Sequence, residues 1–464
     1  MASNYEIGKL KKKIHFIAIG GAAMHNLAIS LKELGNTITG SDDEIFDPAK
    51  TNLQKHGILP EQCGWFPEKI TYDIDAIILG MHARADNPEL LKALQLGIKI
   101  YSFPEYIYKH SEKKKRIVVG GSHGKTTITG MLIHVMLNCG IKTDFLTGAA
   151  VAGMTKNVEL SDDAEYIVIE GDEYLTSPID LRPKFHVYKP DIAVISGIDY
   201  DHYNVFPTYE SYVAQFEIFI NTITKGGTLI YCNDDKHVCN VVNKSDVHIN
   251  KIPYDVLDYF IDGETTLLKT RYGDIPLKIF GKHNILNISA AKSVCNAIGI
   301  SDKDFFTHIS TYAGSKNRLS VLKKNEDFIV FRDFAHAPSK VKATVNAVKQ
   351  QFPQNILVAC LELHTFSSLS VDFLPYYKGA MNEADVPIVY FNPKTVKHKK
   401  LPELSKEKVK EAFDNRCIKV FDNTQEMLYF LSKIDKKGKC FLFMSSGNFD
   451  DVDLFSLFLD ADFR

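Results

Sequence analysis

The chain has 464 residues, of which 45% are hydrophobic and 24% charged, and its formal net charge is −2. A chain of this length is too long for one hydrophobic core, so about three domains of ~100–200 residues are expected. The ordinary hydrophobic content excludes a disordered chain, and the absence of a basic excess argues against a nucleic-acid partner.

The cysteines and the apolar segments bear on location. The 8 cysteines form no Cys-x-x-Cys pair, which argues against a zinc ribbon or a dithiol redox site. Scattered cysteines in a large chain are typical of a reducing cytoplasm. The N-terminus has no apolar signal core, and no segment approaches the ~20 apolar residues of a membrane span. We therefore expect a cytoplasmic protein with no membrane partner.

A nucleotide-binding βαβ unit is predicted at the start of the chain. Residues 14–19 have the pattern of a strand, a glycine turn and a helix follow, and a second strand ends at Asp42. The Gly-x-Gly-x-x-Gly fingerprint of such units is incomplete, because its three positions fall on Ala18, Gly20 and Ala23. Close packing of the helix on the strand would explain the same turn without a nucleotide.

Two further strands complete the first predicted domain. The apolar run 76–79 leads into a polar turn that contains His82, a helix ends near Gly97, and 98–101 is again a strand. Together these elements predict a small parallel sheet that closes near Lys114.

A phosphate-binding loop is predicted next. Residues 117–119 form a β-branched strand, and the segment Gly121-Ser-His-Gly-Lys-Thr-Thr127 leads into a helix that starts at Lys125. Backbone N–H groups at such a helix start, with the helix dipole, form an anion site. Lys125 would contact phosphates and the Thr126 hydroxyl would bind Mg²⁺. The strict P-loop pattern requires glycine where Val119 stands, so an ordinary glycine-rich turn is the alternative.

Polar residues follow two later strands at their carboxyl ends, which form the usual ligand edge of an open α/β sheet. The strand 166–170 ends in Glu170-Gly-Asp-Glu173, where acids are suitably placed to hold Mg²⁺. The strand 192–198 leads to His202. A lone histidine is most often structural, but this one is the second polar feature of the same edge, so we expect it to belong to a site.

The rest of the chain repeats the α/β pattern. A helix after Gly281 carries Asn284 and Asn287, which lie three residues apart and therefore on one face, although helix caps explain most such residues. A third unit begins near Arg318 and has strands at 328–331, 356–361, 387–391 and 441–444. Because strands and helices alternate throughout, we expect parallel sheets.

Taken in order, these motifs resemble the Mur ligase family, the ATP-dependent amide ligases of bacterial cell-wall synthesis. The resemblance covers nearly the whole chain and implies a three-domain α/β architecture. It implies a Rossmann-like UDP-binding domain at 1–114, a central P-loop ATPase domain at 115–316 and a C-terminal Rossmann-like domain for an amino acid or peptide at 317–464.

The resemblance also implies site residues. Those expected to take part in catalysis are Lys125, Glu170, His202, Arg318, Asp333 and His336. Those expected to bind ATP are Gly121, Ser122, His123, Gly124, Lys125, Thr126, Thr127, Asn284 and Asn287. Those expected to hold Mg²⁺ are Thr126, Glu170 and His202. Those expected to bind a UDP-sugar are Gly20, Gly21, Ala22, Ala23, Met24, Ser41, Asp42 and His82.

Within the family, the turn 18–24 and the end of the next strand resemble the branch that activates UDP-N-acetylmuramate. Other branches carry a carbamylated lysine past the histidine, and 203–224 contains no lysine. The branch has members that add L-alanine and members that add the tripeptide L-alanyl-γ-D-glutamyl-diaminopimelate. The turns at 80–84, 362–368 and 444–448 look more like the second kind, so the tripeptide is the favoured acceptor and L-alanine the alternative.

Two other hypotheses lie outside this family branch. A P-loop phosphotransferase or switch ATPase would explain 115–235 but would leave the first and third domains without a role. An inactive UDP-sugar-binding relative would be expected to have lost Lys125, Glu170 or His202, and all three are present. We therefore expect a ligase with small-molecule substrates only, as a monomer or weak homodimer.

Overall fold

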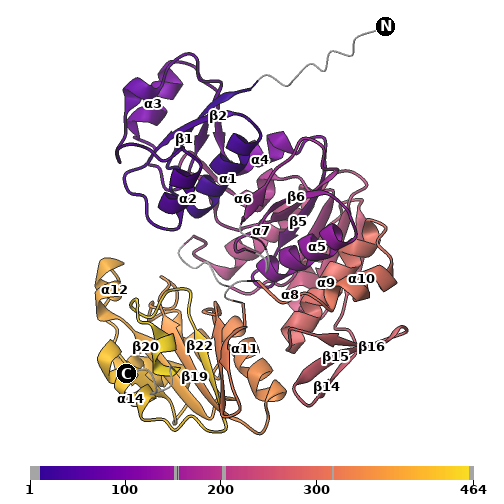
Figure 1. Cartoon of the computed structure of the whole chain (residues 1–464), viewed down its shortest axis with the longest axis vertical. Coiled ribbons are helices and arrows are strands. Elements are labelled where there is room, and N and C mark those ends of the chain that lie inside the picture. The colour runs from indigo at the N-terminus through magenta and orange to yellow at the C-terminus, as the bar shows by residue number, and fades with distance from the viewer. Residues whose placement is uncertain (1–10, 151–153, 155, 201–204, 316–317, 459–464) are drawn as a thin grey trace.

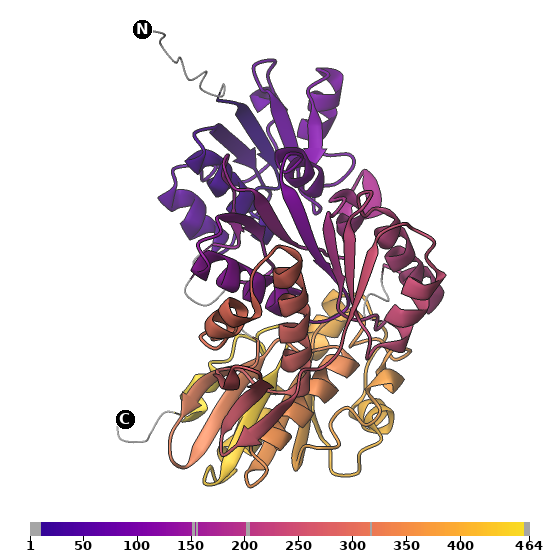
Figure 2. The same cartoon turned by 90° about the vertical axis from the view of Figure 1, so that its right-hand side faces the viewer.

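The computed structural model describes residues 11–150, 154, 156–200, 205–315 and 318–458. In this part of the chain, three large sheets of 4, 7 and 6 strands follow one another along the sequence. They are arranged along the long axis of the molecule, with the 7-stranded sheet between the other two (Figures 1 and 2). Within the described residues, every helix falls short of the length and apolar content needed to cross a membrane.

The N-terminal sheet is parallel, as predicted, with strand order β2-β1-β3-β4. Its strands are β1 (Lys13–Ile17), β2 (Thr37–Ser41), β3 (Ala76–Leu79) and β4 (Ile100–Ser102). Its helices are α1 (Ala22–Glu33), α2 (Ala49–Lys55), the 3-10 helix η1 (Pro67–Lys69), α3 (Pro88–Gln95) and α4 (Phe103–His110). Each predicted strand of this part is confirmed to within about two residues at its ends.

The central sheet has strand order β13-β12-β11-β5-β8-β6-β7. Its strands are β5 (Lys115–Gly120), β6 (Thr143–Leu146), β7 (Val158–Glu159), β8 (Tyr166–Glu170), β11 (Ile192–Ile195), β12 (Thr228–Cys232) and β13 (Asn250–Tyr254). The accompanying helices are α5 (Lys125–Asn138), α6 (Lys184–Val187), α7 (Tyr209–Asn221), α8 (Lys236–Lys244), α9 (Lys282–Ala297) and α10 (Asp302–Ile309). The predicted strand–loop–helix unit is confirmed as β5 followed by α5.

The expectation of parallel sheets throughout is wrong in four places. Strand β7 pairs antiparallel with β6, and β17 (Ser320–Lys324) pairs antiparallel with β18 (Phe328–Asp333). A separate antiparallel sheet consists of β14 (Tyr259–Asp262), β15 (Thr265–Thr270) and β16 (Gly273–Leu277). Between β8 and β11, β9 (Leu175–Ser177) and β10 (Asp180–Pro183) form an antiparallel hairpin, which α6 follows. Short turns, rather than helical crossovers, join most of these strands, and such turns produce antiparallel pairs.

The C-terminal sheet has strand order β17-β18-β22-β19-β20-β21. Its other strands are β19 (Ile356–Leu363), β20 (Val386–Phe391), β21 (Lys419–Phe421) and β22 (Lys439–Met444). Its helices are α11 (Pro338–Gln351), η2 (Leu374–Tyr377), α12 (Pro393–His398), α13 (Lys406–Phe413), α14 (Thr424–Ser432) and η3 (Leu454–Phe458). Alternate residues of β18 enter different clusters, since Phe328 packs in one and Ile329 in the other, so apolar layers cover both faces.

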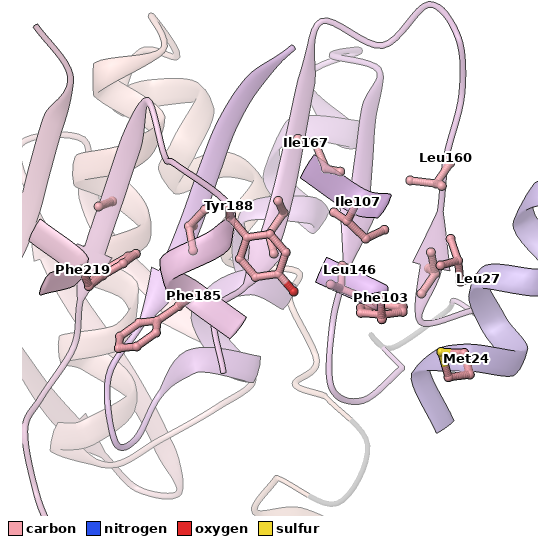
Figure 3. Close-up of a cluster of buried hydrophobic side chains, with 14 of the residues drawn as sticks. Met24, Leu27, Phe103, Ile107, Leu146, Leu160, Ile167, Phe185, Tyr188 and Phe219 are labelled. Carbon is pink, nitrogen blue, oxygen red and sulfur yellow. The ribbon is translucent and has the colours of Figure 1, made fainter. Parts of the chain in front are cut away.

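One hydrophobic core joins the N-terminal and central sheets. Met24 and Leu27 of α1 and Phe103 and Ile107 of α4 belong to the same buried cluster as residues of the central sheet (Figure 3). The central residues labelled in this cluster are Leu146, Leu160, Ile167, Phe185, Tyr188 and Phe219. The shared core fixes the N-terminal sheet against the central one.

Candidate active site between the central and C-terminal sheets

The loop from β5 to α5 takes a shape that requires glycine at two positions. Gly121 has φ +126°, and a Cβ there would lie 2.3 Å from the Ser196 Oγ. Gly124 has φ +77°, and a Cβ there would lie 2.4 Å from the Asn287 Oδ1. Both positions combine a backbone that favours glycine with no room for a side chain. The result is a tight backbone cradle at the start of α5, of the kind that binds phosphate.

Lys125, the first residue of α5, forms a buried ion pair. Its Nζ lies 2.6 Å from Glu173 Oε2 and donates to the Gly121 carbonyl at 2.7 Å. The Lys125 side chain is 12% exposed and that of Glu173 is 0% exposed. Burial opposes the charge on Lys125, but Glu173, Asp172 and Glu170 outweigh it and raise the pKa of the lysine. Lys125 therefore carries its charge at neutral pH, held beside the cradle.

Thr126 connects groups from three parts of the site. Its hydroxyl donates to Glu170 Oε1 at 2.8 Å and accepts from Arg318 Nη2 at 3.0 Å. The other oxygen of Glu170 accepts from the Gly148 backbone N–H at 2.6 Å. The Arg318 guanidinium also stacks on Phe334, 4.6 Å from the ring centroid. A group that precedes the C-terminal sheet thus reaches the head of α5.

Thr126 and Glu170 offer a hydroxyl and a carboxylate on adjacent positions, which suits Mg²⁺, an ion that prefers oxygen ligands and keeps several waters. Among the described residues, no three His, Cys, Asp or Glu side chains gather as a metal cluster. The third predicted ligand, His202, lies outside the described residues. The residues present therefore fit a Mg²⁺ held by few protein ligands.

A cavity of about 520 Å³ brings the predicted residues together. Among the residues that line it are Ser122, His123, Gly124, Lys125, Thr126, Thr127, Glu170, Asn284, Asn287, Arg318, Asp333 and His336. Asn284 donates to the Phe280 carbonyl at 2.8 Å. Its neighbour Asn287 lies in hydrogen-bond range of Asn284 at 3.4 Å. Both asparagines thus face the site as well as stabilising the start of α9.

The C-terminal wall of the cavity is held in place by local hydrogen bonds. Asp333, at the end of β18, accepts from the buried Thr344 hydroxyl at 2.6 Å. His336 Nδ1 lies 2.9 Å from the Phe334 carbonyl, and the His336 carbonyl accepts from the Tyr377 hydroxyl. These bonds fix the loop that presents Asp333 and His336 to the cavity.

The predicted UDP-sugar residues form a separate turn in the N-terminal sheet. Ala18 takes φ +65° at the first fingerprint position, where glycine would be unstrained. Asp42 accepts from the Gly20 N–H at 2.6 Å, and burial raises the pKa of Asp42 to about 6. Ser41 is buried beside it, whereas His82 is exposed. Asp42 therefore shapes the turn directly.

The remaining members of the predicted UDP-sugar set lie at the start of α1. Of these, Met24 is buried and packs in the core, whereas Ala22 is exposed and Gly21 and Ala23 are half-buried. The backbone of the turn, rather than the Met24 side chain, is thus what a ligand could reach.

Several groups of the site were not among the predicted residues, and Glu173, Gly148 and Ser446 are three examples. Glu173 could have been identified, because it stands in the acidic turn that follows β8. Gly148 and Ser446 carry no such signal, since only the fold brings them to this cavity. Among the described residues, the Ser446 hydroxyl is buried and has no hydrogen-bond partner.

Comparison with known proteins agrees with this architecture. Residues 13–115 match the family model described as "Mur ligase family, catalytic domain", and residues 119–295 match "Mur ligase middle domain". A UDP-N-acetylmuramate–L-alanine ligase of Brachyspira hyodysenteriae is 28% identical over 460 residues, covering 95% of this chain and 96% of the relative. The enzyme of the same name from Streptococcus mutans is 28% identical over 474 residues, covering 98% and 96%.

Solved structures share the whole fold. A murein peptide ligase from Psychrobacter arcticus superposes with a TM-score of 0.67 at 23% identity, covering 96% of this chain and 98% of that one. A UDP-N-acetylmuramate–alanine ligase from Thermotoga maritima superposes with a TM-score of 0.69 at 21% identity, covering 95% and 96%. Since two models of one family match in succession and the fold agrees along the chain, the protein belongs to the Mur ligase family of ATP-dependent, ADP-forming ligases.

Proposed function

We propose that this protein joins the lactyl carboxylate of UDP-N-acetylmuramate to the amino group of an L-alanyl acceptor, with ATP cleaved to ADP and phosphate. The favoured acceptor is the tripeptide L-alanyl-γ-D-glutamyl-meso-diaminopimelate. The observation that carries the proposal is the Thr126 hydroxyl, bonded at once to Glu170 and to Arg318. This contact closes the ATP cradle with a group from the acceptor side, as a two-substrate ligation requires.

In the proposed reaction, the carboxylate attacks the γ-phosphorus of ATP to give an acyl phosphate, and the acceptor amine then displaces phosphate. The protein contributes positioning and charge neutralisation. Lys125 would contact the β- and γ-phosphates. Its ammonium has three donors, and the bonds to Glu173 and Gly121 leave one of them for a phosphate oxygen. Mg²⁺ bound at Thr126 and Glu170, with His202, would neutralise further phosphate charge.

The other candidates have roles that follow from their positions around the cavity. Asn284 and Asn287 both line the cavity, and Asn287 lies against Gly124, so these two residues would contact the adenosine end of ATP. Arg318 and Asp333 would contact ATP from the C-terminal side, and His336 would lie near the incoming amine. The turn around Gly20 and the Asp42 carboxylate would bind the UDP moiety.

The proposed organisation has a UDP-sugar domain at 1–114, an ATP domain at 115–316 and an acceptor domain at 317–464. ATP and Mg²⁺ are the proposed cofactors, and the proposed substrates are small molecules. The proposed enzyme is a cytoplasmic monomer or weak homodimer. Since ATP meets groups from two of these domains, we expect domain closure to accompany turnover.

A second acceptor is favoured by a specific finding. The two curated relatives described above are named UDP-N-acetylmuramate–L-alanine ligases, which supports L-alanine. The tripeptide is supported by the resemblance of the turns at 80–84, 362–368 and 444–448 to the peptide-adding members of the branch. The fold-level likeness extends to a murein peptide ligase and to an alanine ligase alike, so it favours neither acceptor.

Initial rates of ADP release test the proposal. With Mg²⁺, ATP and UDP-N-acetylmuramate present, we expect release to depend on the acceptor and to be faster with the tripeptide than with L-alanine. Faster release with L-alanine would make the protein the alanine-adding enzyme. Release that ignores both UDP-N-acetylmuramate and the acceptor would refute the ligase assignment for these substrates.

A further inference from the structure

A short basic segment follows the fourth strand of the C-terminal sheet. Residues 394–400, here called the basic segment, contain Lys394, Lys397, His398, Lys399 and Lys400 and no acidic residue. They form most of α12 and the turn after it, at the carboxyl end of β20. In Figure 1, α12 rises from the C-terminal sheet on the side of the molecule that holds the other two sheets.

The lysines of the basic segment are not neutralised by the protein. Within the described part of the chain, no carboxylate forms an ion pair with any of them, and three of the four are exposed. Other lysines beside the same sheet do form ion pairs. The Nζ of Lys349 lies 2.6 Å from the Oδ2 of Asp385, and the Nζ of Lys378 lies 3.0 Å from the Oδ2 of Asp414. A run of unpaired charge is usually a solvated face, so a second observation is needed to make it a binding surface.

That second observation is a contact with the rim of the active-site cavity. Lys399 Nζ lies 4.4 Å from the ring centroid of Phe366, which is 44% exposed. Phe366 directly follows Thr365, which lines the 520 Å³ cavity together with Ser446. A cation stacked on an aromatic ring is held in a defined place. The basic segment is thus anchored to the acceptor side of the cavity.

The spacing of the strands fits an acceptor longer than one amino acid. Strands β22, β19 and β20 are adjacent and parallel, so their carboxyl ends lie along one edge. From the loop after β18, which carries His336, to the end of β20 is three strand spacings, or roughly 14 Å. A fully extended α-linked tripeptide spans about 10 Å, and the γ-linked glutamate and the diaminopimelate side chain lengthen the proposed acceptor further. A single alanine spans only about a third of that 10 Å.

We propose that the basic segment, anchored by the stacking of Lys399 on Phe366, binds the distal carboxylates of an anionic peptide acceptor. This inference rests on the proposed ligase function and adds where the acceptor lies and why a peptide is preferred. The tripeptide named above carries three carboxylates beyond its reacting amine, while L-alanine carries one beside that amine. Only the peptide brings negative charge to the end of β20.

The test combines a change in the acceptor with a change in the protein. The acceptors are the tripeptide and the same tripeptide with its carboxylates amidated, and the triple variant is Lys397→Gln, Lys399→Gln and Lys400→Gln. In the unchanged protein, we expect amidation to raise the acceptor KM about tenfold, equivalent to ~1.4 kcal/mol. In the triple variant, the KM of the unmodified tripeptide should rise about as much, and amidation should have little further effect.

A matched control is available in the same sheet. Lys433 also stacks on an aromatic ring, with Nζ 5.1 Å from the centroid of Tyr429, but it lies at the end of α14, before β22 begins. Lys433→Gln should leave the acceptor KM unchanged. The KM values for ATP and UDP-N-acetylmuramate should be unchanged in both variants, which also reports that the fold is intact.

Four results would overturn the inference. If amidation raised the acceptor KM equally in the unchanged protein and the triple variant, the lysines would not be the groups that bind the carboxylates. An equal rise in acceptor KM for Lys433→Gln would reduce the effect to general surface charge. Turnover of L-alanine but not of the tripeptide would refute both the favoured acceptor and this binding surface, whereas a tripeptide KM that ignores the lysines refutes only the surface.

Discussion

The ion pair between Lys125 and Glu173 leads to a prediction that separates stability from activity. The two charges are buried, 12% and 0% exposed, and lie 2.6 Å apart. We consider three variants: Lys125→Met, Glu173→Gln and the double variant. Each single change removes one charge of the pair and leaves the other buried beside a neutral side chain, whereas the double change removes both charges.

The expected magnitudes follow from the burial. At 2.6 Å and an effective dielectric constant of about 20, the gross attraction is ~6 kcal/mol. Desolvation of both groups offsets much of this, and loss of one partner of a buried pair typically costs ~3–5 kcal/mol. We expect Lys125→Met to lose about 4 kcal/mol of unfolding free energy. Glu173→Gln should lose about 2 kcal/mol, because other acids remain near the lysine.

The double variant should also lose only about 2 kcal/mol, which gives a coupling energy of about 4 kcal/mol.

Urea unfolding and ADP release are the assays. Because the chain has three large sheets, unfolding can occur in more than one step, so the transition compared is the one that added ATP moves to higher urea. We expect the double variant to recover stability relative to Lys125→Met while both remain at least ~100-fold less active than the unchanged protein. A coupling energy below ~0.5 kcal/mol would contradict the buried pair. Recovery of activity in the double variant would contradict the proposed contact of Lys125 with the phosphates.

Three further variants test other parts of the site. Burial raises the pKa of Asp42 to about 6, so ionisation of Asp42 destabilises the fold as the pH rises from ~4 to ~6, and the cost persists at higher pH. Asp42→Asn should therefore raise the unfolding free energy by up to ~2 kcal/mol at pH 7.5 and by almost nothing at pH 4. An equal gain at both pH values would contradict this explanation. Gly124→Ala would put a Cβ 2.4 Å from the Asn287 Oδ1 at φ +77°, so thermal unfolding should show a loss of about 1–3 kcal/mol together with loss of ATP-dependent turnover, and unchanged turnover would argue against the cradle. Arg318→Lys should lower kcat/KM for ATP roughly 10- to 100-fold, since lysine cannot both stack on Phe334 and donate to Thr126 as the guanidinium does. Full activity in this variant would show that Arg318 has no role in ATP binding or turnover.

Much of the fold could be predicted from the sequence because buried parallel strands are continuous apolar runs. Ile117–Val119 and the run 76–79 are examples, and both became strands as expected. The antiparallel sheet β14–β16 was missed because its strands are half exposed and only partly alternating. Its turns did carry a signal in two glycines that take positive φ, Gly263 between β14 and β15 and Gly273 at the first position of β16.

The site residues that belong to a local sequence motif could be predicted. Those that come together only because the fold joins distant segments could not be predicted. The glycine loop and the acidic turn pointed to Lys125, Thr126 and Glu170, which the structure brings together. That Glu173, rather than Glu170, holds the lysine depends on how β8 ends beside α5, which no spacing in the sequence encodes. The link from Phe366 to Lys399 likewise depends on the order of strands in the C-terminal sheet.

The proposed activity is the ligation of UDP-N-acetylmuramate to a peptide acceptor. The most direct test supplies ATP, Mg²⁺, UDP-N-acetylmuramate and equal concentrations of L-alanine and the tripeptide in one reaction, and identifies the products by mass. The product ratio then reports the ratio of kcat/KM for the two acceptors. We predict that the UDP-N-acetylmuramoyl-tripeptide predominates with one ADP formed for each product; predominance of the alanine product, or ADP without either product, would contradict the account.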